Sequence, residues 1–126
     1  MKDVLLSIKP KYAAMIYAGQ KLVEFRRSLP YSAKEWRRFY IYETSPVQMV
    51  TGWANVSYVT AATVPLIWRV FQHEGGISYK DYSRYMAGKS EAWALEISNF
   101  YMFAEPLPLS SFGIDRPPQG WRYIYH

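Results

Sequence analysis

The spacing of apolar residues in the first twenty positions predicts a strand followed by a helix. Val4–Ile8 is a short apolar run bounded by charged residues, which is typical of a buried strand. Pro10 suits the first turn of a helix, because the N–H that proline lacks would have no partner there. Ala13 and Ile16 then recur at helical spacing, and Gly19 fits a left-handed helix cap.

From Lys21 the apolar period changes to two, which predicts a strand with one polar face. Val23 and Phe25 point to one side, whereas Glu24 and Arg26 point to the other. Strict alternation would place Lys21 opposite Glu24, so these two side chains converge only if the chain entering the strand after Gly19 is irregular. A lysine at a strand entry is expected to contribute little to the core.

Three further strands and two short helices are predicted downstream. The strands are Arg37–Tyr42, Val47–Val59 with a bulge or bend at Gly52, and Ala92–Phe103. Between the last two strands, a helix begins near Pro65 and ends at Gly75 and Gly76, and a second helix is capped by Ser78 and ends at Gly88.

The segment from Glu105 to His126 is rich in proline, yet it keeps many large apolar residues. This is not the composition of a linker, so the segment is expected to pack against the rest of the molecule. The order of elements predicts an α+β fold, a small mixed β-barrel with short helices at its rim. Residues 1–126 are expected to form one domain.

Composition narrows the classes of partner. The chain carries a net charge of +5, which favours anionic partners, above all nucleic acid. Its 12 tyrosines and 5 tryptophans exceed what one small core usually holds, so some rings are expected at the surface, where they either stack on nucleobases or simply rim the core. No apolar run is long enough to span a membrane, and the start of the chain is not typical of a secretory leader. The absence of cysteine fits a cytoplasmic protein.

Four blocks of the sequence resemble the ASCH domains of the PUA-like superfamily. The stretch LLSIKPKYAAMIYAGQKLVEFRR contains the family hallmark G-x-K-x-x-E-x-R on Gly19, Lys21, Glu24 and Arg26, without gaps. YIYETSPV, GISYKDYSRYMAGKSEAWALEI and RPPQGWRYI follow in the order that the family shows, so the resemblance covers nearly the whole chain.

The resemblance implies a PUA-like β-barrel with helices across one opening and a cleft beside it. PUA-like domains bind RNA or read modified nucleobases, and ASCH proteins include an N4-acetylcytidine amidohydrolase and a ribonuclease. Other members are described as RNA-binding proteins or transcription-related regulators. The resemblance therefore predicts the fold more closely than the chemistry.

The binding interpretation places RNA or a modified nucleoside in a cleft around the hallmark. Lys21 and Arg26 would hold a phosphate or a carbonyl group, and Glu24 would accept hydrogen bonds from an exocyclic amine. Ser45 could donate to a base edge. Stacking faces are expected from Tyr42, Trp121 or Tyr123, with Arg122 or Tyr123 near the cleft.

The hydrolase alternative assigns catalysis to Lys21 and Glu74. The amidohydrolase-like members use a lysine in the hallmark, a threonine three residues later and a glutamate near the middle helices. Glu24 stands in the threonine position, and Glu74 misses the third place by one residue. Lys21 would act as base and Glu74 would shuttle the proton. A carboxylate at Glu24 would repel a developing oxyanion, so weak or no deacetylation is expected.

Two observations weigh on these interpretations. Lys21, Glu24 and Arg26 could instead form a surface charge network of little energetic value. Arg37 and Arg38 close a basic stretch that begins at Arg26, and this stretch is either a solvated loop or a patch that follows a phosphate backbone.

Tyr79, Tyr82 and Tyr85 are expected to pack the second helix rather than to stack on bases. His73 and His126 are isolated, so neither a metal site nor a cofactor is predicted.

Overall fold

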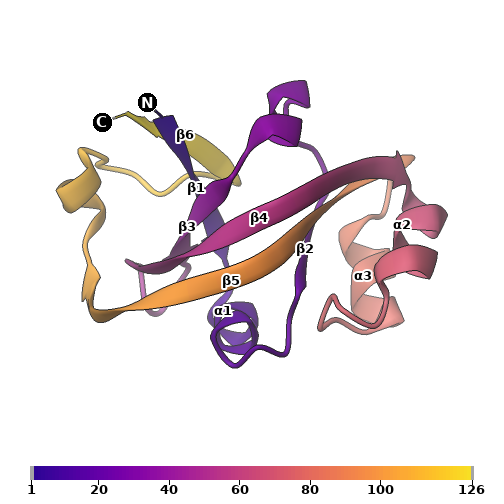
Figure 1. Cartoon of the computed structure of the whole chain (residues 1–126), viewed down its shortest axis with the longest axis horizontal. Coiled ribbons are helices and arrows are strands. Elements are labelled where there is room, and N and C mark those ends of the chain that lie inside the picture. The colour runs from indigo at the N-terminus through magenta and orange to yellow at the C-terminus, as the bar shows by residue number, and fades with distance from the viewer. Residues whose placement is uncertain (1, 126) are drawn as a thin grey trace.

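A computed structural model describes residues 2–125, whose strands form one six-stranded sheet in the order β2-β5-β4-β3-β1-β6 (Figure 1). The elements alternate along the chain as the periodicity predicts. In order they are β1 (Lys2–Ile8), α1 (Pro10–Tyr17), β2 (Val23–Arg26), the 3-10 turn η1 (Tyr31–Glu35), β3 (Arg38–Glu43), β4 (Met49–Thr63), α2 (Val64–Phe71), α3 (Tyr79–Tyr85), β5 (Glu91–Leu107), the 3-10 turn η2 (Leu109–Phe112) and β6 (Trp121–Tyr125).

The two longest strands, β4 and β5, pair antiparallel and form the middle of the sheet. Their register shifts near Gly52 and again between Asn55 and Tyr58. A Cβ atom at Gly52 would lie 2.1 Å from the carbonyl oxygen of Tyr101 on β5, so a larger residue would push the two strands apart. The irregularity predicted at Gly52 is thus confirmed.

The main core lies between the sheet and α1. Ala13 and Ile16 from α1 pack against a set of strand residues that includes Phe39, Ile41 and Leu95. A second, smaller cluster holds Leu5. Because Val4 and Leu6 belong to the main core and successive side chains of a strand alternate, this cluster lies on the other face of the sheet. It consists of Leu5, Tyr42, Val50, Ile114 and Ile124.

The helices α2 and α3 pack at one end of the sheet, on the right of Figure 1, and enclose a third cluster. Tyr82 from α3 and Ile67 from α2 pack there against Phe25 of β2. The Ser78 hydroxyl accepts a hydrogen bond from the Asp81 N–H at 3.1 Å, so the predicted cap of α3 is confirmed.

The C-terminal segment packs against the molecule, as its apolar content predicts. β6 pairs antiparallel with β1, from Lys2 opposite Tyr125 to Leu6 opposite Trp121. Ile124 is 4% exposed and belongs to the second cluster. The strand therefore extends the sheet rather than trailing from it.

The prediction that the strand after Lys21 has a polar face is wrong. β2 begins at Val23, and all four of its residues are buried, including Glu24 and Arg26. Elements from distant parts of the chain cover both sides of β2, which periodicity within a single strand does not reveal.

The six strands form a sheet with two edges, β2 and β6, so closure into a barrel stays unconfirmed. A mixed α+β sheet with short helices is present. The organisation of residues 1–126 as one domain stays a prediction. Within residues 2–125, no helix has the length and apolar character needed to cross a bilayer.

Candidate functional site

The hallmark residues Lys21, Glu24 and Arg26 form a buried network of charges. Gly19 has a φ of 72°, a conformation that glycine adopts without steric cost, and the chain runs irregularly through residues 20–22 before β2 begins. This irregular entry lets Lys21 reach Glu24, with 3.5 Å between Nζ and Oε1. Arg26 donates from Nη1 to Glu24 Oε2 at 2.9 Å. Each carboxylate oxygen of Glu24 therefore faces one cation.

Lys21 belongs to the core of the molecule. Only 3% of the residue is exposed, and its ammonium group also donates to the carbonyl oxygen of Gly75. The ammonium lies 5.1 Å from the ring centre of Tyr12 and 5.7 Å from that of Phe25. Burial lowers the pKa of Lys21 from its ordinary 10.5, and the Glu24 carboxylate opposes part of that shift. The expectation that this lysine contributes little to the core is wrong, because the loop at Gly75 encloses it.

Arg26 connects β2, at one edge of the sheet, to β1 and to the segment before β6, near the opposite edge. Besides its ion pair with Glu24, Arg26 donates to the carbonyl oxygen of Ser7 at 3.2 Å and to that of Gly120 at 3.1 Å. Ser7 lies on β1, and its own N–H bonds to Gly120 at 2.9 Å. One guanidinium group thus connects β2, β1 and the segment before β6. A surface charge network does not describe these residues, since each is at most 9% exposed.

The charge network forms part of the wall of a cavity of about 530 Å³. Such a volume lies within the range of small-molecule sites in proteins. Five lining side chains are cationic and two are carboxylates, which leaves an excess of positive charge. The cations are Lys9, Lys11, Lys21, Arg26 and Arg84, the carboxylates are Glu24 and Asp81, and the other lining residues are Ser7, Ile8, Tyr12, Phe25, Thr44, Ile77, Tyr85, Gln119 and Gly120.

Tyr12 and Tyr85 line this cavity and were not singled out as ligand-binding residues from the sequence. Desolvation raises the pKa of Tyr85 above its ordinary 10.0, while the nearby Arg26 opposes that shift. The expectation that Tyr85 serves only to pack the helix is therefore incomplete, whereas Tyr82 is 1% exposed and does pack there. Tyr82 and Tyr85 are three positions apart, a spacing that places them on the same side of α3, so the sequence held no signal that separated their roles.

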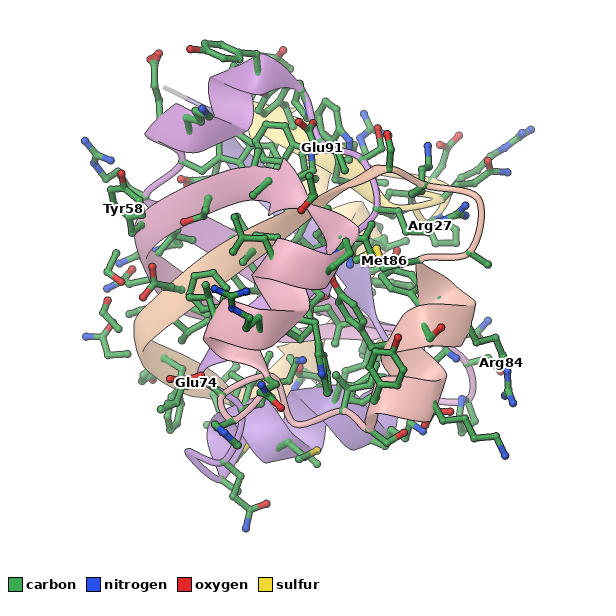
Figure 2. The ribbon with its side chains drawn as sticks, turned by 90° about the vertical axis from the view of Figure 1, so that its right-hand side faces the viewer. Arg27, Tyr58, Glu74, Arg84, Met86 and Glu91 are labelled. Atoms are coloured by element: carbon green, nitrogen blue, oxygen red, sulfur yellow. The ribbon has the colours of Figure 1, made fainter. Side chains whose placement is uncertain are left out.

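Glu74 does not line the cavity. Its backbone carbonyl accepts hydrogen bonds from the N–H groups of Leu22 and Val23, so the residue supports the start of β2 through its main chain. Figure 2 shows Glu74 and the cavity residue Arg84 on opposite sides of the helical layer. The ion pair of Lys21 is with Glu24, and its ammonium group donates to the carbonyl oxygen of Gly75. The direct Lys21–Glu74 contact that the proton-shuttle hypothesis requires is not among the ion pairs of the described residues.

Tyr42 and Ser45 also lie outside the cavity lining. Tyr42 is 3% exposed and packs with Leu5 and Val50 in the second apolar cluster, so its ring offers no free face to a base. Ser45 is exposed in the turn between β3 and β4, next to a cis peptide bond to Pro46. Its neighbour Thr44 lines the cavity instead.

Arg37 and Arg38 are separated from the hallmark arginine. Arg26 faces the cavity, whereas Arg37 lines a second, smaller cavity of about 220 Å³ together with Lys34 and Tyr58. Arg38 lies on β3, where its guanidinium group stacks on a tryptophan ring. The basic stretch predicted from the sequence therefore does not form one continuous patch with the cavity.

The predicted residues of β6 contact one another rather than the cavity. The rings of Trp121 and Tyr123 lie 5.1 Å apart, and both contact the buried ring of Trp36. The Tyr123 hydroxyl also contacts the Ser32 hydroxyl at 2.8 Å. Arg122 is exposed and does not line the cavity. Gln119 and Gly120, just before the strand, are the tail residues that do.

Among residues 2–125, no group of three or more His, Cys, Asp or Glu side chains is arranged to hold a metal ion. His73 is exposed, and His126 lies outside the described residues. The absence of a cofactor stays a prediction.

A named relative and a crystal structure match this chain over most of its length. An ASCH domain-containing ribonuclease of Zymomonas mobilis is 30% identical over 132 residues, which cover 98% of this chain and 84% of that protein. The crystal structure of the ASCH protein from Zymomonas mobilis superposes with a TM-score of 0.87 at 28% identity, covering 98% of this chain and 87% of that one.

A longer relative contains a similar segment. The large ribosomal subunit protein uL22 of Ureaplasma parvum is 30% identical over 124 residues, and the chain spans 39% of that protein's length. A family model described as the ASCH domain matches residues 6–102. The chain therefore belongs to the ASCH domain family, within the PUA-like superfamily.

Proposed function

We propose that this ASCH domain binds RNA by holding one nucleotide, or a modified nucleoside, in the cavity around Lys21, Glu24 and Arg26. The observation that carries the proposal is the combination of a cationic rim, a rigid charged wall and aromatic side chains around one cavity. A nucleotide presents the matching groups, because it joins an anionic phosphate to a flat base with hydrogen-bonding edges.

Lys9, Lys11 and Arg84 would attract the phosphate groups. All three line the cavity and are exposed, so their charges are free to meet a ligand at the entrance. Arg84 has a weak ion pair with Asp81 at 3.9 Å between mostly exposed groups, which costs little to break. The rim therefore supplies the sequence-independent part of the affinity.

The inner wall would read the base. The charges of Lys21, Glu24 and Arg26 are fixed by one another and by the carbonyl oxygens of Gly75, Ser7 and Gly120. Fixed polar groups recognise a ligand well because little conformational entropy is lost when it binds. Tyr12 and Tyr85 offer aromatic surface beside this wall.

A thermal-shift screen tests this proposal. Uridine and cytidine 5′-monophosphate, N4-acetylcytidine and short RNAs are added to the native protein and to Arg84→Gln, Lys21→Met and Lys80→Met. A ligand at a hundred times its Kd adds about 2.7 kcal/mol to the free energy of unfolding. We expect stabilisation of the native protein and of Lys80→Met, an exposed change on the same helix outside the cavity lining.

We expect Arg84→Gln and Lys21→Met to lose most of that stabilisation. Arg84→Gln is an exposed change that keeps the fold, so it preserves the test if Lys21→Met is poorly folded. Stabilisation of the native protein by none of the ligands, or equal stabilisation of native protein and Arg84→Gln, would contradict the proposal.

RNA cleavage in the same cavity is the second candidate, favoured by the relative named as a ribonuclease. Burial lowers the pKa of Lys21, which raises the share of its neutral amine, the form that accepts a proton. In this candidate, Lys21 takes the proton of a ribose 2′-hydroxyl, whose oxygen attacks the adjacent phosphorus, and the 5′-oxygen leaves with a proton from water. Arg84 and Arg26 stabilise the charge that develops on the phosphate.

Cleavage has a distinct chemical signature. The native protein, incubated with end-labelled RNA in a chelating buffer, is expected to yield fragments that end in a 2′,3′-cyclic phosphate. A single 2′-deoxy substitution at the cleaved position removes the nucleophile and abolishes the product. Fragments with other ends, or cleavage that continues in Lys21→Met, would exclude this role for Lys21, whereas no cleavage by the native protein would leave binding as the function.

A further inference from the structure

A ladder of aromatic rings crosses the sheet on the face away from α1. Neighbouring ring centres are 5.5 Å apart from Phe112 to Tyr40, 6.4 Å from Tyr40 to Phe103, and 6.0 Å from Phe103 to Tyr101. The next pair, Tyr101 and Trp53, is 5.6 Å apart and nearly parallel, with 27° between the ring planes. The guanidinium group of Arg38 lies 3.7 Å from the Trp53 ring centre. We call Phe112, Tyr40, Phe103, Tyr101, Trp53 and Arg38 the outer ladder.

The outer ladder is anchored at one end and open at the other. Tyr40, Phe103 and Phe112 pack against the second apolar cluster, which holds that end in place. Tyr101 is 52% exposed, and Trp53 is half-buried directly opposite it in the β4–β5 register. Contiguous exposed apolar surface is a feature of interaction sites.

A cation and two amide side chains lie beside the open end, and further cations lie just before the start of β3. Arg38 donates from Nε to the Asn55 side-chain oxygen at 3.1 Å, and Asn55 pairs across the strands with the exposed Asn99. Arg37, the residue before Arg38, is exposed and lines the 220 Å³ cavity with Lys34. Tyr58, 64% exposed, lines the same cavity and points away from β4 into solvent in Figure 2.

We propose that the open end of the outer ladder is a stacking platform for single-stranded RNA. An unpaired base stacks on the exposed face of Tyr101, whose other face packs on Trp53, and the adjoining phosphate approaches Arg38. This combination of exposed rings with cations at one end complements a strand whose bases are flat and whose backbone is anionic. An apolar protein partner would match the rings but not the guanidinium group of Arg38 that lies against them.

This platform goes beyond the nucleotide cavity, because the two sites share no residue and lie on different parts of the molecule. The cavity accepts a single nucleotide, whereas the platform adds affinity only for a strand long enough to carry several bases. Each site can therefore be tested without the other.

The experiment measures the Kd of a fluorescein-labelled ten-residue oligouridylate by fluorescence anisotropy. Tyr101→Ala is expected to weaken binding by about 5- to 150-fold, the range that loss of one base–aromatic stack produces. Tyr101→Phe keeps the ring and is expected to bind within twofold of the native protein, whereas Tyr101→Leu is expected to behave like Tyr101→Ala. Tyr125→Ala, a more exposed tyrosine at 73% on β6, is the matched control and should leave Kd unchanged.

Two further ligands distinguish base stacking from the attraction of phosphate to cations and from binding in the cavity. Inorganic polyphosphate has no bases, so native protein and Tyr101→Ala should bind it equally. Uridine 5′-monophosphate reports on the cavity alone, and Tyr101→Ala should leave its Kd unchanged. Melting temperature confirms that each variant is folded.

The proposal is overturned if the native protein does not bind the oligouridylate, or if Tyr101→Ala binds it as tightly as the native protein. The second result would leave the outer ladder as a surface for a protein partner. Equal weakening of oligouridylate and polyphosphate binding in Tyr101→Ala would likewise overturn stacking as the source of affinity. None of these outcomes decides whether the cavity binds a nucleotide.

Discussion

Glu24 divides its two carboxylate oxygens between Lys21 and Arg26, and this sharing fixes the charge of the cavity wall. With two cations and one carboxylate, the network keeps one positive charge in a place that is almost closed to water. The resemblance to the ASCH hallmark predicted that these residues lie together. Its burial could not be foreseen, because the enclosing groups at Gly75 and Gly120 lie about 50 and 95 positions away along the chain.

Glu24→Gln is expected to destabilise the protein strongly. The neutral amide leaves Lys21 and Arg26 as two buried cations without a counter-charge, and breaking a buried ion pair from one side costs about 3–5 kcal/mol. The free energy of unfolding in urea measures the loss. Glu91→Gln, an exposed change at the start of β5, is the control and should stay within about 0.5 kcal/mol of the native value. Similar losses in both variants would show that the network stabilises little.

Tyr82 is expected to make stability fall at alkaline pH. Its hydroxyl donates to the Val64 carbonyl oxygen at 2.7 Å, and desolvation raises its pKa from 10.0 to about 12. Between pH 10 and pH 12 the unfolded chain ionises this group while the folded chain keeps the proton. The folded state then binds more protons, so the free energy of unfolding falls as pH rises through that window.

Tyr82→Phe provides the comparison. At pH 7 the variant should lose about 1 kcal/mol, the usual net value of one hydrogen bond. Above pH 10 its stability should fall less steeply than that of the native protein, as measured by urea unfolding at half-unit steps of pH. Parallel curves for the two proteins would contradict a raised pKa for Tyr82.

The loop between α2 and α3 shows how one element positions the side chains of another. A Cβ atom at Gly75 would lie 2.1 Å from the ring of Phe25, and the Gly75 carbonyl accepts a hydrogen bond from Lys21. The sequence predicted a helix that ends at this glycine, whereas α2 ends at Phe71 and a short turn leads to Gly75. It did not reveal that the glycine is needed for close packing against β2, because the Phe25 ring comes from a strand about 50 positions earlier.

Gly75→Ala is expected to lower the free energy of unfolding by about 1–3 kcal/mol, the usual cost of forcing an extra carbon into a packed site. It should also weaken ligand binding in the cavity, since Lys21 loses the position of its acceptor. Gly88→Ala is the matched control: this glycine has a φ of 84° but no atom within 4 Å of the added carbon, so only backbone strain results. Gly88→Ala should therefore leave ligand binding unchanged. If it weakened ligand binding as much as Gly75→Ala does, the steric explanation would be refuted.

Periodicity located most elements of this chain within a few residues, because strands and helices bury one face in a regular way. It failed for β2, where Glu24 and Arg26 occupy a face that the pattern assigns to solvent. It also failed for Tyr42, whose ring packs in a small cluster formed partly by the C-terminal residues Ile114 and Ile124. In both cases the deciding contacts cross between the two ends of the chain.

At the scale of the whole molecule, two separate regions each gather several cations, the cavity lining and the neighbourhood of Arg37. Both regions are positively charged, but different groups lie beside the charge. Cations at the rim adjoin a cavity, whereas Arg38 adjoins the half-buried ring of Trp53. Both are expected to contribute to affinity through the release of counterions from RNA.

RNA affinity should therefore fall steeply with salt. For single strands, the slope of log K against log salt concentration is about −0.7 for each phosphate that a cation neutralises. The double variant Arg37→Gln and Arg38→Gln should make the slope shallower by roughly 0.7 for each of the two arginines that binds a phosphate in the native complex. Filter binding of a ten-residue RNA between 50 and 300 mM salt measures both slopes, with Lys89→Gln as the control. An unchanged slope in the double variant would show that these arginines do not meet the backbone.

The pairing of β1 with β6 brings Lys2 directly opposite Tyr125, so the chain enters and leaves the sheet at one point, near the marked ends in Figure 1. Opposed residues of antiparallel strands lie only about 5 Å apart. A host protein could therefore accept this unit within a surface loop and continue from almost the same position, because the span of its loop would hardly change. The same proximity would allow new ends to be opened elsewhere after the two strands are joined by a short linker, so a circular permutant is expected to keep the sheet.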